Sequence, residues 1–257
     1  MRVWPIFKKE MRLYFTSPIA YVILFIFLLV MGWFFSQIFQ FYAQLSMRAA
    51  MQPMGGQDLN VTEGILRPLF SNIAVILLLS LMPLLTMRLF AEERRSGTME
   101  LLLTYPVRDG AILLGKYLAA LALYAILLGL TLLYPAMIFY LARLEWGPVL
   151  TGYVGLLLLG SAFLAVGLFA SSLTENQVVA AVITFGILLM FWVIGWGAES
   201  AGGAWWGRVL SHLSITDHFE SFAKGVFETR DVVYYVNFTL LALFLTLRSL
   251  EARRWNG

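Results

Sequence analysis

The sequence lacks cysteine, which excludes disulfide bonds and thiolate metal sites. Charge is scarce as well, because Asp, Glu, Lys and Arg make up 13% of the 257 residues, against about 25% in soluble domains. Hydrophobic residues make up 60%, against about 45–50% in soluble domains. A chain of this composition has too little polar surface to cover itself in water, so it needs lipid as a solvent.

Apolar runs long enough to cross a bilayer recur along the chain. A hydrocarbon core of ~30 Å requires about 20 predominantly apolar residues in a helix. The sequence therefore predicts an all-α integral membrane protein, with residues 1–257 forming a single transmembrane domain. Its six spans are expected at 19–42, 69–90, 111–141, 149–170, 178–196 and 232–247. The first run is too long for a signal peptide, so we expect the N-terminus to be retained.

Residues 1–17 have the pattern of a basic amphipathic helix. At 100° per residue, the basic side chains fall on one arc and the aromatic and aliphatic ones on the other. This pattern predicts an elbow helix that lies in the membrane interface and contacts lipid headgroups. The alternative is a positively charged flank that only orients the first span. The residues expected to seat the elbow helix are Trp4, Phe7, Lys8, Lys9, Met11 and Arg12.

The distribution of positive charge predicts the orientation of the chain. Twelve of the eighteen Lys and Arg residues lie in or beside the segments that share one side of the membrane with the N-terminus. Cytoplasmic segments carry an excess of these residues. We therefore expect a multi-pass protein of the cell inner (cytoplasmic) membrane, with both termini in the cytoplasm.

The segment 199–231 is too polar to cross the membrane and too apolar to be a plain loop. Asp217 and Glu220 have the spacing of a capping box, and Gly225 can end a helix. Trp205 is suited to the membrane interface, where tryptophan is enriched. We predict short helices at the outer membrane face, placed before the sixth span.

No pattern in the sequence predicts catalysis. The segment from Gly110 to Lys116 approaches a phosphate-binding P-loop, but Tyr117 replaces the Ser or Thr that would hold magnesium. His212 and His218 lie near carboxylates, but their spacing matches no standard metal site. We therefore expect no catalytic residue, no metal and no cofactor, and no nucleotide hydrolysis by this chain itself.

Ionisable residues are nearly absent from the middle of the expected spans. Arg88 and Lys116 lie near the inner boundary, where long side chains can reach the interface. The absence of central charges argues against a secondary carrier or a channel, which remains the alternative function. Glycines in the fourth span could break a helix as carriers require, but close helix packing is the commoner reason for them. They are Gly152, Gly155, Gly160 and Gly167.

The connection between the second and third spans carries the densest charge. Gly97 can break a helix, Thr98 can cap the next one, and Pro106 can stop it. The segment 91–107 is therefore predicted to hold a short cytoplasmic helix whose apolar middle docks into a partner, and the alternative is a solvated loop. The residues expected at this contact are Glu92, Glu93, Arg94, Arg95, Gly97, Thr98, Glu100, Leu101, Leu102 and Leu103.

This connection resembles the signature of ABC-2 type permeases. The motif reads Glu92-Glu93-Arg94-x-Ser96-Gly97-Thr98-x-Glu100-x-Leu102-Leu103-Thr104-x-Pro106-Val107. The resemblance extends over the whole chain, and its flanks look most like the gliding-motility-associated permease branch. These flanks are Tyr14-Phe15-Thr16-Ser17-Pro18, Asp217-His218-Phe219-Glu220-Ser221-Phe222-x-x-Gly225 and Arg230-Asp231-Val232-x-Tyr234.

The resemblance implies an ABC exporter in which this chain forms the transmembrane path. Its coupling helix, between spans two and three, would seat in an ABC ATPase subunit present in two copies. A second permease chain, identical or paralogous, would complete the complex. The outer segment 43–67 is short, so an outer domain that grips substrate would come from an accessory subunit. Lipid is the remaining partner, no nucleic acid is expected, and nothing in the sequence selects a substrate.

The predicted topology can be tested with single cysteines, because the natural chain has none. A cysteine at Ser46 should react with a membrane-impermeant reagent added outside intact cells, and one at Ser96 should react only after the cells are opened. The opposite labelling pattern would mean that the map is inverted.

Overall fold

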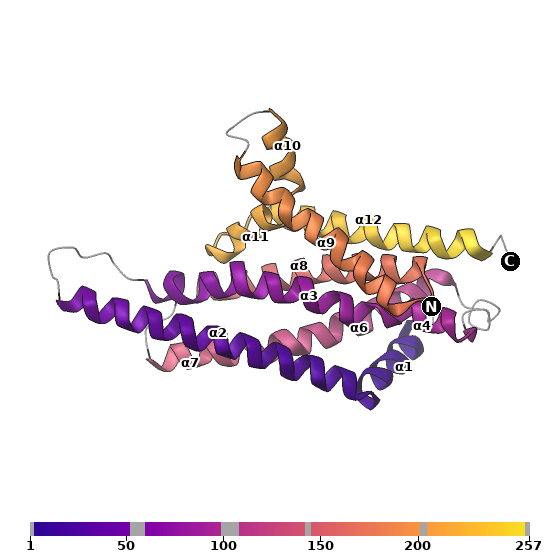
Figure 1. The fold of residues 1–257 in the computed structure, drawn as a ribbon, viewed down its shortest axis with the longest axis horizontal. Coiled ribbons are helices and arrows are strands. Elements are labelled where there is room, and N and C mark those ends of the chain that lie inside the picture. Colours follow the sequence, from indigo (N-terminus) through magenta and orange to yellow (C-terminus); the bar gives the residue numbers. More distant parts are fainter. Residues whose placement is uncertain (1–2, 52–59, 99–107, 142–144, 201–204, 255–257) are drawn as a thin grey trace.

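Six helices in the described part of the chain are long and apolar enough to cross a membrane (Figure 1). The computed structural model describes residues 3–51, 60–98, 108–141, 145–200 and 205–254. Every regular element within these ranges is a helix. The prediction of an all-α integral membrane protein with six spans is therefore confirmed.

The first span is longer than its apolar run. Helix α1 (Val3–Thr16) ends before Ser17. Helix α2 (Pro18–Met51) starts after this residue and runs in a new direction (Figure 1). With 34 residues, α2 is about 51 Å long at ~1.5 Å per residue, so it extends beyond a core of ~30 Å. It continues past the predicted end at residue 42 because residues 43–51 include Ala, Gln, Leu, Met and Arg, which are strong helix formers.

The second span is built of several helical segments and runs from Thr62 to Arg95, where 69–90 was predicted. Charged residues at both ends, such as Glu63 and Glu92, hide these extensions from a search for apolar runs, although they are compatible with a helix. The first part of the span is π-helical, a form with wider turns than the α-helix. The segments are η2 (Thr62–Leu66), η3 (Leu69–Ala74), α3 (Val75–Thr86) and α4 (Arg88–Arg95).

The remaining spans are nearly regular. The third is divided at Leu132, and the others are single helices. α1 and the end of α12 lie at the same end of the bundle (Figure 1), as six crossings require. These helices are α6 (Asp109–Thr131), α7 (Leu133–Leu141), α8 (Trp146–Leu173), α9 (Gln177–Ser200) and α12 (Thr229–Arg254).

Two short helices lie between the fifth and sixth spans. In Figure 1, α10 (Trp205–Leu213) projects from the bundle, and α11 (Ile215–Ala223) lies close to it. The N-cap of α11 is Ser214, whose Oγ accepts a hydrogen bond from the Asp217 amide at 3.2 Å. The capping box was expected at Asp217 and Glu220, but the helix is capped three residues earlier, at Ser214 and Asp217. Gly225 follows the end of α11 with φ +87°, which favours glycine.

Helix α8 is the centre of the bundle, because α3, α4, α6, α9, α11 and α12 all pack against it. A Cβ on Gly152 would lie 2.7 Å from the Phe70 ring, and one on Gly155 would lie 2.6 Å from Phe222. On Gly160 and Gly167 a Cβ would overlap Tyr124 and Thr86. Since α8 is unbroken, its glycines serve close packing and do not interrupt the helix.

Replacing one of these glycines should therefore destabilise the fold. We expect Gly167→Ala to lower the free energy of unfolding by about 1–3 kcal/mol, because Thr86 is fully buried and has no space to move into. Thermal unfolding of the purified protein would measure this loss. Gly129→Ala in α6 is the matched control, since a Cβ there meets nothing within 4 Å. Equal melting temperatures for the two variants would contradict the packing argument.

Candidate functional site

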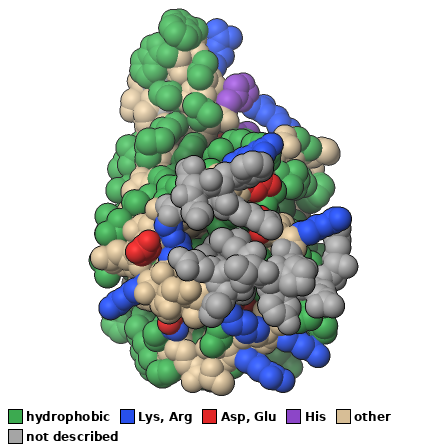
Figure 2. Space-filling model, turned by 90° about the vertical axis from the view of Figure 1, so that its right-hand side faces the viewer, with side chains coloured by type: hydrophobic (Ala, Val, Ile, Leu, Met, Phe, Trp, Pro, Cys, Tyr) green, Lys and Arg blue, Asp and Glu red, His purple; other side chains and the backbone are tan. Residues whose placement is uncertain are grey.

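Charged side chains of distant segments meet at one end of the bundle, which we call the elbow end. It is formed by α1, α4, the start of α6 and the end of α8. Figure 2 looks onto this end and shows Lys and Arg side chains around its margin, with hydrophobic side chains along the flanks. The predicted contact residues from Glu92 to Thr98 lie here, whereas Glu100, Leu101, Leu102 and Leu103 lie outside the described residues.

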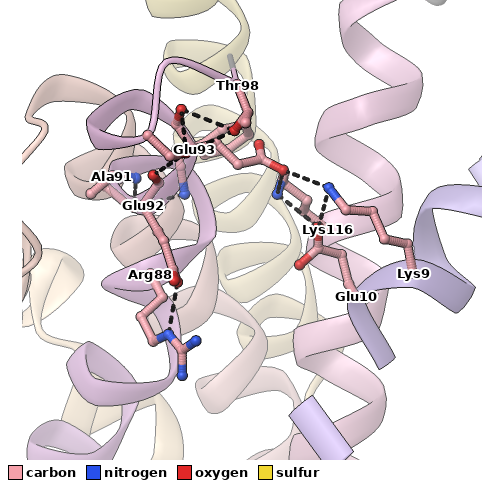
Figure 3. A network of polar contacts seen from close by, with 11 residues as sticks. Lys9, Glu10, Arg88, Ala91, Glu92, Glu93, Thr98 and Lys116 are labelled. Carbon is pink, nitrogen blue, oxygen red and sulfur yellow. Dashed lines mark hydrogen bonds and ion pairs between the residues drawn. The ribbon is translucent and has the colours of Figure 1, made fainter. Parts of the chain in front are cut away.

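A buried ion cluster joins three of these helices (Figure 3). Lys116 Nζ of α6 lies 2.8 Å from Glu10 Oε1 of α1 and 3.0 Å from Glu93 Oε1 of α4. Lys9 Nζ, also of α1, lies 2.9 Å from the same oxygen of Glu93. The side chains of Lys116 and Glu10 are 2% and 7% exposed. One ammonium group thus binds carboxylates from two other helices in a largely buried position.

The cluster is stable only as a set. Removing one member of a buried ion pair strands the charge of the other, which costs far more than the pair contributes. The Phe90 ring adds a cation–π contact with Lys116 Nζ at 5.4 Å. Burial alone would lower the pKa of Lys9, but its hydrogen bond to Glu93 and the charges of Glu93 and Glu10 raise that pKa. The ammonium form of Lys9 is therefore favoured in the cluster.

This cluster was not predicted from the sequence. Lys116 was expected at the inner boundary with its side chain reaching the interface, whereas the structure buries the ammonium group between helices. Glu10 was not among the predicted residues. The available signal was a carboxylate on the face of an amphipathic helix that carries Ile6 and Tyr14, since this face has no reason to hold an unpaired charge.

The elbow helix is anchored on the bundle through the same face. A Cβ on Gly115 would lie 2.7 Å from Ile6 Cγ2, so α1 lies directly against α6. The hydroxyl of Tyr14 donates a hydrogen bond to the Leu85 carbonyl at 3.1 Å. Of the residues predicted to seat α1 on lipid, Trp4, Lys8, Lys9 and Arg12 are exposed, and Phe7 and Met11 are half-buried. Lys9 also reaches the ion cluster through its ammonium group.

Helix α4 is also fastened to the end of α8. Ser171 Oγ accepts hydrogen bonds from the amides of Phe90 and Ala91, each at 3.1 Å, and donates one to the Met87 carbonyl at 3.0 Å. Arg94 donates to the Ser172 carbonyl at 2.6 Å. Of the residues predicted to contact a partner, Arg94 and Glu93 are therefore bound to the bundle itself. Glu92 and Arg95 are exposed.

The chain turns sharply after α4. Gly97 has φ +70°, a conformation that other residues rarely adopt, and its amide donates to the Arg94 carbonyl at 3.1 Å. Thr98 Oγ1 donates to the Glu93 carbonyl at 3.2 Å and lies 2.8 Å from Ser96 Oγ. These bonds fix the direction in which the chain leaves α4 and enters 99–107.

A cavity of about 190 Å³ opens beside the ion cluster. It lies between α1 and α4, and its charged lining includes Lys9, Glu10, Arg88, Glu92 and Glu93. Arg88 Nε lies 2.9 Å from Glu92 Oε2. These are groups that form ion pairs and hydrogen bonds, so the site is suited to holding elements together and to meeting a charged partner.

The histidines do not form a metal site in the described part of the chain. His218 Nδ1 lies 2.7 Å from Asp231 Oδ1, and its Nε2 lies 3.3 Å from the His212 carbonyl oxygen. Both ring nitrogens of His218 are thus already engaged by oxygen atoms. Asp217 and Glu220 are the nearby carboxylates in the sequence, but the carboxylate partner of His218 is Asp231, on α12.

The ion cluster can be tested by removing its central charge. We expect Lys116→Met to lower the free energy of unfolding by about 3–5 kcal/mol, because the buried Glu10 then loses its cation at 2.8 Å and keeps only the more distant Lys9 ammonium group at 3.9 Å. The double variant Lys116→Met/Glu10→Gln should recover part of this loss in thermal unfolding of the purified protein. Arg248→Met is the control, since its pair with Glu251 is exposed and contributes less than about 1 kcal/mol. A Lys116→Met loss as small as the control's would refute the role of the cluster.

Comparison with known proteins identifies the family. The family model described as ABC-2 family transporter protein matches residues 4–248, from α1 to α12. A search of curated proteins found no match. The membrane domains of ABC-2 permeases are not catalytic themselves and work with an ABC ATPase subunit, so a secondary carrier or a channel is not favoured. The chain therefore belongs to the ABC-2 family of transporter proteins, as a permease that spans the membrane.

Proposed function

We propose that this chain is the permease subunit of an ABC-2 exporter in the cell inner membrane, with both termini in the cytoplasm. Two copies of a separate ATPase subunit would supply energy, and a second permease chain, identical or paralogous, would complete the transmembrane path. The observation that carries the proposal is the double attachment of α4, to α6 through Glu93 and to α8 through Ser171 and Arg94.

This attachment supports a mechanism of coupling. An ATPase that closes on the segment 91–107 would push on α4, because the end of α4 lies in the described part of that segment, residues 91–98. Because α4 is bound to both α6 and α8, such a push would displace these two spans together. Helix α8 contacts most of the other helices, so its displacement would reshape the whole domain. Packed helices of this kind move as discrete units and do not deform continuously.

Different residues of the segment 91–107 would have different roles in binding the ATPase. Glu92 and Arg95 are exposed at the elbow end and would orient the ATPase by charge. Leu101, Leu102 and Leu103 would supply the buried contact, since binding energy concentrates in desolvated central residues. Gly97 and Thr98 would set the angle between α4 and this contact.

The low burial of the fifth and sixth spans supports further partners. In each of these spans, only 22% of the most apolar 18-residue stretch is buried within the chain. Their outer faces would therefore meet lipid or the second permease chain. The proposal extends to an accessory outer subunit, because the segment 43–67 has no room for a large domain. Assignment to the gliding-motility-associated branch rests on the sequence motifs alone and stays a prediction.

Coupling can be tested by placing a charge in the proposed contact. We expect Leu102→Asp to reduce ATPase binding, and stimulation of ATP hydrolysis by the permease, roughly tenfold or more, because the carboxylate would be buried without a partner. Both would be measured with the permease in proteoliposomes. Leu213→Asp on α10 is the matched control: Leu213 is exposed at the opposite end and should leave coupling intact.

The result that contradicts this assignment is equally definite. If Leu102→Asp and Glu100→Arg both bind the ATPase and stimulate hydrolysis as the natural chain does, the segment 91–107 is only a connecting loop.

A further inference from the structure

A second, larger cavity lies away from the elbow end. It has a volume of about 710 Å³ and is bounded by the π-helical part of the second span, the last turns of α9, and α11. We call it the far groove. Its volume lies within the ~300–1,000 Å³ typical of small-molecule sites. No residue that lines it belongs to the ion cluster, so it is a separate feature of the molecule.

The wall from the second span has an unusual backbone. η2 and η3 are π-helical, and such turns are rare and frequently occur at functional sites. Pro68, between them, has no amide to donate. Ser71 Oγ, also in this wall, is buried and has no hydrogen-bond partner in the described structure. The wall thus contains a buried polar group that is unsatisfied among the described residues.

The charge of the groove is mostly negative. Its lining holds three carboxylates, Glu63, Asp217 and Glu220, and one guanidinium, Arg67. Glu220 is engaged by Lys224 and by Arg67, each at 2.8 Å, and the hydrogen bonds and charges of these two cations lower its pKa. Glu63 and Asp217 have no ion pair within the described ranges. Neither carboxylate therefore has a cation among the described residues, although Asp217 Oδ1 accepts a hydrogen bond from Ser214 Oγ at 2.8 Å.

The opposite wall is aromatic. The rings of Trp192 and Trp196 in α9 lie 4.5 Å apart between centroids, and Trp196 is 59% exposed. Indole faces attract organic cations, and their area suits apolar groups. Gly195 keeps this wall close to α11, since a Cβ there would lie 2.6 Å from Thr216 Oγ1. The groove thus combines carboxylates with an aromatic surface in a fixed arrangement.

We propose that the far groove binds an amphiphilic organic cation, with its charge near Glu63 and Asp217 and its apolar body against Trp192 and Trp196. An anion of the same shape would be repelled by the two carboxylates. The role of this cation as cargo rests on the proposed exporter function, but its binding does not, because the groove lies within a single chain.

The test compares two ions of matched shape and opposite charge. The full chain in lipid nanodiscs is dialysed to equilibrium against tetraphenylphosphonium or tetraphenylborate, and binding to empty nanodiscs is subtracted. We expect saturable binding of the phosphonium cation and none of the borate anion. Glu63→Gln and Trp196→Leu should each weaken the binding by about three- to tenfold. Glu228→Gln and Trp206→Leu are the controls, since both residues are exposed outside the groove and should have no effect.

Other outcomes would overturn the proposal. Equal binding of both ions, or equal loss in Glu63→Gln and Glu228→Gln, would mean that the groove does not select cations. Absence of saturable binding, together with a cysteine at Glu63 that cannot be labelled in the purified protein, would assign the groove to a contact with a second copy. Saturable binding without ATP-driven transport of the cation would keep the site but remove its role as a cargo site. Such a result would leave the coupling test at Leu102 unaffected.

Discussion

Close approach to α8 is the constraint on which the rest of the structure depends. Side chains from the second and third spans and from α11 occupy the places where Cβ atoms would lie on four of its five glycines. Lipid offers no hydrophobic driving force between helices, so their association relies on contacts of this kind. Six elements can then share one helix as their common neighbour. A displacement of α8 would therefore change its contacts with nearly all the other helices.

At the elbow end, packing is combined with charge. Lys116 can be buried in a span only because α1 and α4 bring carboxylates to it, and α1 and α4 are in turn held in place by that ammonium group. The elbow helix is therefore a structural part of the bundle. On this helix Lys8 and Arg12 are exposed and Glu10 is buried, whereas Lys9 is exposed along its length and joins the ion cluster through its ammonium group.

The two polar regions of the molecule differ in how far their charges are satisfied. At the elbow end, Glu10 and Glu93 are both paired with lysines, which suits a rigid connection between helices. In the far groove, Glu63 and Asp217 have no cationic partner among the described residues, and Trp192 and Trp196 line the same groove. Carboxylates that are bound by lysines hold elements together, whereas carboxylates without a cation leave an interaction for a ligand. This contrast matches the proposed separation of coupling from substrate binding.

The sequence by itself determined the class of protein, the number of spans and the family. Apolar runs of sufficient length can only be helices in lipid, and a motif such as Ser96-Gly97-Thr98 acts over a few residues. Only the tertiary structure decided the partners of Lys116 and His218 and the existence of the far groove. Glu10 lies 106 residues from Lys116, and neither local propensity nor periodicity records which faces of two helices will meet. The lengths of α2 and of the second span could not be predicted from apolar runs either, because the ends of these helices are polar.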